Sequence, residues 1–138
     1  MSFQPELWVE RAGAAVEFYE AAFGATVLHR VGEGDDIVAQ PGVGDAAFWV
    51  ASAGPCKKRF SPQAIGGATS RTLLVTDDPD AVLERTVGAG ATETSPVADE
   101  HGRRLGRIVI GSVTRVTLAR RPLRGGGCEP PASWDQRR

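Results

Sequence analysis

The sequence predicts an α+β fold made of two copies of one β-α-β-β-β module, related by a pseudo-twofold axis. Each half of the chain reads as a strand, a helix and three further strands; in the first half the helix has apolar residues at helical spacing, and Gly-rich turns separate the strands. The second half also repeats the first at an offset of 66 residues, from Leu7 to Leu73. A chain of 138 residues, 41% of them hydrophobic, is long enough for two such modules to share a core.

The first module is expected to span about residues 4–52. Its elements are a strand, a helix and three strands, predicted at 4–10, 13–23, 26–31, 36–40 and 46–51. The helix carries apolar residues at positions i, i+3, i+4 and i+7, namely Ala15, Phe18, Tyr19 and Ala22. Gly24 is expected to end it, because the residue after a helix often needs a positive φ.

The second module is expected to span about residues 70–120, after a long loop at 53–69. Its elements are predicted, in the same order, at 70–76, 79–88, 92–97, 105–110 and 113–120. Asp78 is a good N-cap for the helix, and Pro79 suits its first turn, where a missing N–H is no loss. Residues 1–122 therefore form one predicted domain, followed by a disordered tail at 123–138 that contains Trp134.

The repeat supports a duplicated module. At an offset of 66, Leu7 and Val9 meet Leu73 and Val75, and Gly24-Ala25-Thr26 meets Gly90-Ala91-Thr92. Small apolar residues match easily, so the tripeptide after the helix is the more specific part of the match.

Composition restricts the partners of the chain. A net charge of −1 gives no overall field to attract nucleic acid or an anionic membrane. No apolar run approaches the ~20 residues of a membrane span, and the N-terminal residues do not resemble a signal peptide. We therefore expect a cytoplasmic protein in which Cys56 and Cys128 are unpaired thiols.

Three stretches of the chain are informative together: Leu7-Trp8-Val9-Glu10, the helical segments Ala14 to Tyr19 and Ala22 to Ala25, and Arg104 to Val109. They resemble the glyoxalase/bleomycin-resistance family, also called the vicinal oxygen chelate superfamily. The resemblance covers about residues 4–120 and implies two modules with curved mixed sheets, a small-molecule ligand and a homodimer. It departs at residues 110–114, where many relatives carry an Asp-Pro-Phe-Gly-His-like turn; divergence and a shifted reading frame are the two interpretations.

The resemblance also indicates where metal-dependent relatives hold their ligands. The four positions fall here on Gln4, Trp49, Ser70 and Thr117. Divalent transition metals prefer imidazole, carboxylate or thiolate donors, and an indole has no usable lone pair. We therefore expect no bound metal and no other cofactor.

Strand parity assigns side chains to the two faces of each sheet. It places Leu7, Val9, Leu73 and Val75 in the core. The opposite face is predicted to hold nine ligand-binding residues: Gln4, Glu6, Trp8, Trp49, Ser70, Thr72, Leu74, Arg115 and Thr117. Two indoles, a carboxylate and a guanidinium suit a planar or cationic ligand. The alternative is that Trp8 and Trp49 only fill a collapsed pocket or a dimer interface.

These observations favour binding over catalysis. The leading hypothesis is a metal-free protein of the bleomycin-resistance type that sequesters a small aromatic or cationic compound. One alternative is a metal-dependent lyase, isomerase or dioxygenase of the same superfamily, and another is a non-enzymatic structural or regulatory dimer. No nucleophile elbow, phosphate loop or H-E-x-x-H motif is present, and we expect His29 and His101 to be surface residues.

Overall fold

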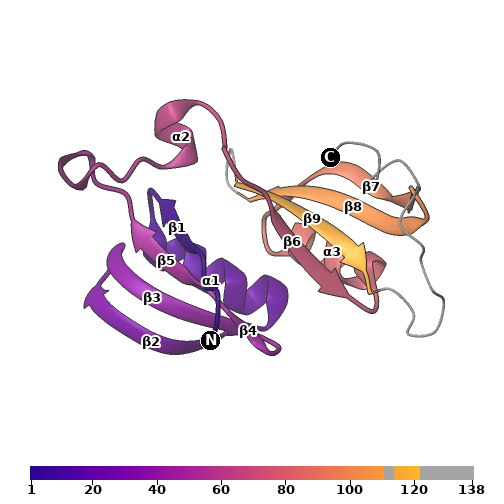
Figure 1. The fold of residues 1–138 in the computed structure, drawn as a ribbon, viewed down its shortest axis with the longest axis horizontal. Coiled ribbons are helices and arrows are strands. Elements are labelled where there is room, and N and C mark those ends of the chain that lie inside the picture. Colours follow the sequence, from indigo (N-terminus) through magenta and orange to yellow (C-terminus); the bar gives the residue numbers. More distant parts are fainter. Residues whose placement is uncertain (111–113, 122–138) are drawn as a thin grey trace, which may run out of the picture.

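The computed structural model describes residues 1–110 and 114–121. Two modules with a β-α-β-β-β layout lie side by side, the first with an additional two-residue strand, and a segment that contains a short helix joins them (Figure 1). The first contains β1 (Glu6–Val9), α1 (Ala12–Phe23), β2 (Thr26–Glu33), β3 (Asp36–Val43), β4 (Ala46–Ala47) and β5 (Trp49–Ser52). The second contains β6 (Thr72–Thr76), α3 (Pro79–Gly88), β7 (Thr92–Glu100), β8 (Arg103–Ile110) and β9 (Thr114–Arg120). The predicted tail, with Cys128 and Trp134, lies outside the described residues.

Each module builds a mixed sheet, and the two sheets have equivalent strand orders. The strand order is β1-β5-β3-β2 in the first sheet, with β4 on β3, and β6-β9-β8-β7 in the second. In each sheet the first strand runs parallel to the last strand of its module, and the other pairs are antiparallel. The matching orders confirm the predicted fold of two related modules, and β1 and β6 are each left at a sheet edge.

Local signals fix the two long helices. Gly24 follows α1 with a φ of 65°, a left-handed conformation that glycine adopts without steric cost. The Asp78 carboxylate accepts a hydrogen bond of 3.1 Å from the Ala81 N–H, and Pro79 begins α3. Both the N-cap and the helix bounds of 79–88 were expected from the sequence.

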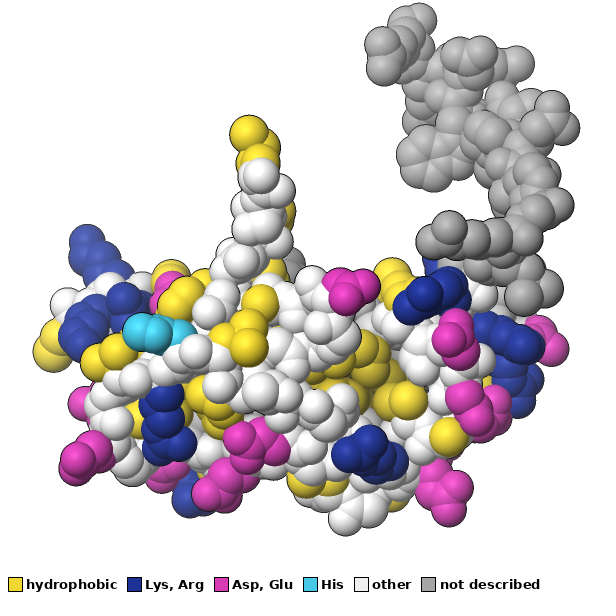
Figure 2. Space-filling model, turned by 90° about the horizontal axis from the view of Figure 1, so that it is seen from below, with side chains coloured by type: hydrophobic (Ala, Val, Ile, Leu, Met, Phe, Trp, Pro, Cys, Tyr) yellow, Lys and Arg dark blue, Asp and Glu magenta, His cyan; other side chains and the backbone are white. Residues whose placement is uncertain are grey.

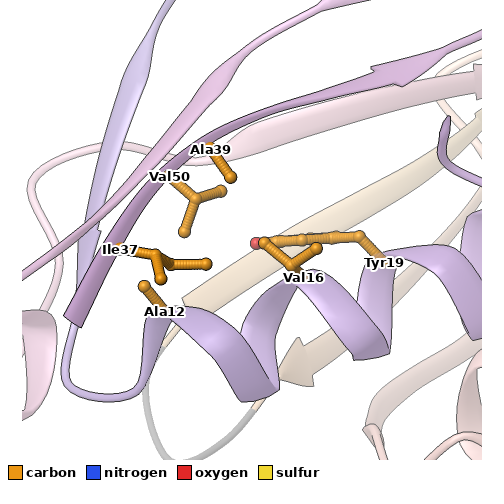
Figure 3. Close-up of a cluster of buried hydrophobic side chains, with 6 residues drawn as sticks. All are labelled: Ala12, Val16, Tyr19, Ile37, Ala39 and Val50. Atoms are coloured by element: carbon orange, nitrogen blue, oxygen red, sulfur yellow. The ribbon is translucent and has the colours of Figure 1, made fainter. Parts of the chain in front are cut away.

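The helices cover one face of each sheet and join the two modules. In the first core, Ala12, Val16 and Tyr19 of α1 pack against buried residues of β3 and β5 (Figure 3). Phe18 and Phe23 of α1 pack against this cluster and also against the core of the second module. Arg85 of α3 donates a hydrogen bond of 2.9 Å to the Ala21 carbonyl of α1. The interior between the modules is therefore lined mainly by helices.

The segment between the modules is more ordered than the loop predicted at 53–69. It contains a 3-10 turn, η1 (Pro55–Lys57), and a short helix, α2 (Pro62–Ile65). The Ser61 hydroxyl caps α2 by accepting a hydrogen bond of 3.1 Å from the Ala64 N–H, and proline follows at the first helical position. Ser61-Pro62 is thus a helix start of the kind that Asp78-Pro79 gives to α3.

Strand parity holds in β1 and fails in β6. Leu7 and Val9 pack against the first core, as expected. Leu74 packs against the second core, whereas Leu73 and Val75 are 52% and 41% exposed. The predicted faces of these three residues were therefore wrong, because a shift of one residue moves every side chain of a strand to the other face.

The strand register explains this reversal. Glu6 pairs with Trp49 in the first sheet, and Leu73 pairs with Thr117 in the second. If Trp49 and Thr117 correspond, Glu6 corresponds to Leu73, an offset of 73 − 6 = 67. The N-caps Arg11 and Asp78 share this offset, whereas β2 and β7 start 92 − 26 = 66 residues apart. The repeat therefore has no single offset.

The visible surface mixes the two signs of charge. On the face drawn in Figure 2, acidic and basic side chains alternate, with apolar side chains between them. Within the described residues, no helix combines the length and the apolar character needed to cross a membrane. Cys56 is exposed and unpaired in the described part of the chain.

Candidate functional site

A cavity of about 250 Å³ lies at the free edge of β1, where the two modules meet. Its first wall is β1 itself, through Glu6, Leu7, Trp8 and Val9. Its second wall is the linking segment, through Phe60, Pro62, Ile65 and residues 67–70. The second sheet completes it with Thr72 and Arg115. The pocket therefore forms where the edge of β1, the linking segment and the second sheet come together.

The backbone of β1 adds polar groups to this cavity. The Pro5 and Val9 carbonyls accept hydrogen bonds of 2.8 Å from the N–H groups of Trp49 and Ala53, on the β5 side. Backbone groups of successive residues point to opposite sides of a strand, so those of Glu6 and Trp8 are directed to the free edge. A ligand in the cavity can use them as hydrogen-bond partners.

Ser61 holds α2 against the end of β1. Its side chain is 1% exposed and donates a hydrogen bond to the Glu10 carboxylate, just after β1. Because the same hydroxyl caps α2, one side chain connects the helix to the strand. This arrangement keeps Phe60 and Ile65, which are 48% and 55% exposed, over the cavity.

A carboxylate and an indole stand together in the β1 wall. The Trp8 Nε1–H donates a hydrogen bond of 3.1 Å to Glu6 Oε2, which holds the carboxylate beside the ring. Trp8 remains 38% exposed, so part of the indole is accessible. A negative charge beside an aromatic surface is the chemistry that binds organic cations.

Gln4 and Trp49 lie next to this wall, in a separate polar cluster. Gln4 Oε1 accepts hydrogen bonds of 3.0 Å from both the Trp49 indole and the Gln40 amide. The His29 ring meets Trp49 edge-on, with centroids 5.9 Å apart. Sequence reasoning missed Gln40 and His29, because only the pairing of β2, β3 and β5 brings them beside Trp49.

The remaining two predicted residues belong to the second sheet. Leu74 packs into the second core and does not face a pocket, which corrects its predicted position. Thr117 is only 6% exposed, and its Oγ1 has no hydrogen-bond partner among the described residues. Its neighbour Arg107 forms an ion pair of 2.8 Å with Glu100, and this hydrogen bond from Arg107 holds the pKa of Glu100 below its usual range.

The donor set does not fit a metal ion. Gln4 and Trp49 bond to each other on the first sheet, Ser70 lines the cavity, and Thr117 is buried in the second sheet. At the observed offset of 67, Arg71 replaces Ser70 as the counterpart of Gln4. No group of three or more His, Cys, Asp or Glu in residues 1–110 and 114–121 is placed to hold a metal ion.

Five of the nine predicted residues line the cavity: Glu6, Trp8, Ser70, Thr72 and Arg115. The apolar cover from Phe60, Pro62 and Ile65 was not predicted, because this segment read as a loop. The Ser61-Pro62 pair was the available signal for a helix there.

Comparison with known proteins identifies relatives of this fold. A sequence model described as Glyoxalase/Bleomycin resistance protein/Dioxygenase superfamily matches residues 3–109. A search of curated proteins found no match.

Solved structures share the architecture. A gene product from Arabidopsis thaliana is 24% identical with a TM-score of 0.68, over 86% of this chain and 98% of that one. TioX from Micromonospora sp. ML1 is 21% identical with a TM-score of 0.66, over 87% and 98%. A bleomycin-binding protein, solved in complex with bleomycin, is 18% identical with a TM-score of 0.63, over 88% and 99%.

Proposed function

The chain belongs to the Glyoxalase/Bleomycin resistance protein/Dioxygenase superfamily, and we propose that it is a metal-free binding protein that sequesters a small aromatic or cationic compound. The observation that carries this proposal is the Glu6 carboxylate held beside the accessible Trp8 indole in the cavity at the edge of β1. A mostly apolar cleft with a few polar anchors is the usual small-molecule site. One protein of the same fold was solved with bleomycin bound.

The proposed ligand-binding residues are the cavity residues Glu6, Trp8, Ser70, Thr72 and Arg115. Gln4 and Trp49 extend this surface, because Trp49 is the strand partner of Glu6 and its indole is fixed by Gln4. Leu73 and Val75 remain exposed on the second sheet, where a second copy would bury them. A cytoplasmic homodimer is therefore part of this proposal, since a twofold pair is the commonest closed assembly.

The first prediction concerns Trp8. Replacing Trp8 by alanine is expected to weaken binding of a planar cation by roughly 2- to 30-fold, because aromatic contact contributes about 0.5–2 kcal/mol. Candidate ligands come from a screen of aromatic and cationic compounds, read as saturable quenching of tryptophan fluorescence. Affinities of the wild type and Trp8→Ala are then compared by calorimetry.

Val87→Ala is the matched control for the loss of an exposed apolar side chain. Val87 is 42% exposed on α3 and does not line the cavity, so affinity should not change. The proposal fails if no compound in the screen saturates, or if Trp8→Ala binds as tightly as the wild type. The first of these outcomes favours a structural or regulatory dimer.

The second prediction separates binding from metal-dependent catalysis. The donors at Gln4, Trp49, Arg71 and Thr117 do not suit a divalent transition metal, so purified protein should hold no stoichiometric zinc, nickel, iron or manganese. Added ions should also leave the melting temperature unchanged, because only a ligand of the native state raises it. Elemental analysis and thermal melts measure both. One tightly bound equivalent of metal would instead support the lyase, isomerase or dioxygenase alternative.

A further inference from the structure

Two opposite charges face the cavity at the edge of β1. Among its described lining residues, only Glu6 and Arg115 are charged. Glu6 comes from β1 of the first sheet, and Arg115 comes from β9 of the second. The other described lining residues are apolar, glycine or hydroxyl-bearing, so the cavity carries one negative and one positive group on an otherwise uncharged surface.

Neither charge is neutralised by a described protein partner. Within residues 1–110 and 114–121, Arg115 forms no ion pair; the arginines that do are Arg11, Arg104, Arg107 and Arg121. Glu6 accepts the indole N–H of Trp8 and forms no ion pair in this part of the chain. The two groups are therefore available to a ligand and do not pair with each other.

We propose that the ligand is a small zwitterion with an apolar body, such as an aromatic α-amino acid. This inference rests on the proposed function and names the ligand class of the same cavity. The ammonium group of the ligand pairs with Glu6, and its carboxylate pairs with Arg115, whose guanidinium matches the planar geometry of a carboxylate. The apolar body lies against Trp8, Phe60 and Ile65.

The size of the cavity agrees with this class. Its volume of about 250 Å³ lies below the roughly 300–1,000 Å³ of pockets for drug-sized ligands. Glu6 and Arg115 are both exposed in the free protein, and a ligand that fills the cavity would partly desolvate them. A ligand with only one charge would leave either Glu6 or Arg115 partly desolvated and unpaired.

Three matched probes test the inference: L-phenylalanine, phenethylamine, which lacks the carboxylate, and 3-phenylpropionate, which lacks the amine. Phenylalanine should bind about tenfold more tightly than either analogue, the effect of one charge-assisted hydrogen bond. In the Glu6→Gln variant, phenylalanine should bind no more tightly than 3-phenylpropionate. In the Arg115→Gln variant, phenylalanine should bind no more tightly than phenethylamine. Calorimetry with the full chain measures each affinity.

The control variants remove the same charges elsewhere. Arg120→Gln lies on the same strand as Arg115, and Glu17→Gln lies on α1; both residues are exposed and outside the cavity, so neither change should alter the order of the probes. If phenethylamine binds as tightly as phenylalanine and Arg115→Gln has no effect, the zwitterion is excluded while cation binding stands. The same conclusion follows if other aromatic cations saturate the protein and phenylalanine does not. If nothing binds, both the zwitterion and the proposed function are excluded.

Discussion

Replacing Leu118 by alanine is expected to lower the free energy of unfolding by about 2–5 kcal/mol, the range for a large-to-small change in a packed core. Leu118 lies in β9 with no exposed surface, and packs in the second core with Ile108 and Val116. The change removes apolar contacts and leaves a cavity that the surrounding strands fill only in part. Urea denaturation followed by circular dichroism measures the loss.

The neighbouring strand supplies matched controls. Leu74 pairs with Leu118 and packs against the same core, so Leu74→Ala should also destabilise clearly. Leu73 is 52% exposed on the opposite face, and Leu73→Ala should cost no more than about 1 kcal/mol. A larger loss of stability for Leu73→Ala than for Leu74→Ala would contradict the observed register. It would support the side-chain faces predicted from an offset of 66.

Local signals in the sequence predicted most of the fold. The helix at 79–88 was predicted with Asp78 as its N-cap and Pro79 in its first turn, and the structure has the same bounds. The alternation of Leu7 and Val9 with Glu6 and Trp8 predicted the burial along β1, in which Leu7 and Val9 are half-buried against the first core and Glu6 and Trp8 are exposed. These features depend on neighbours a few residues away, so one sequence is enough to reveal them.

The prediction of strand faces in the second module depended on a comparison between segments that lie far apart in the sequence. The match of Gly24-Ala25-Thr26 with Gly90-Ala91-Thr92 is correct for the turn after each helix, since β2 and β7 begin at Thr26 and Thr92. Before that turn the helices differ in length, with 12 residues in α1 and 10 in α3. One offset therefore cannot align both sides of the helix, and the chance identity of Leu7 with Leu73 concealed the shift.

The cavity was only partly predictable for a similar reason. Parity along β1 identified Glu6 and Trp8, but a four-residue helix such as α2 is too short to show helical periodicity. A long-range contact, the hydrogen bond from Ser61 to Glu10, helps to place α2. The sequence therefore predicted the chemistry of one wall and not the cover opposite it.

Raising the pH through the range from about 10 to 12 is expected to destabilise the protein through Tyr19. Burial raises the pKa of Tyr19 to about 12, from an ordinary value of 10.0 in the unfolded chain. The folded state therefore favours the neutral phenol. The full contribution of this pKa difference to the free energy of unfolding is present below pH 10. As the pH rises, the unfolded state loses this proton first, so unfolding becomes easier until both states are deprotonated. Two pKa units correspond to about 2–3 kcal/mol at most.

Tyr19 is the only tyrosine of the chain, so its ionisation can be followed directly by ultraviolet difference absorbance. The midpoint in the folded protein should lie well above that of the urea-unfolded protein. Tyr19→Phe keeps the ring that packs against Phe48 and removes the titrating group, so its stability should fall less over the same pH range. Because other groups also titrate at high pH, the difference between the two proteins is the quantity attributed to Tyr19. Parallel stability curves, or a folded midpoint near pH 10, would show that the side chain is accessible to solvent and that α1 does not hold it in the first core.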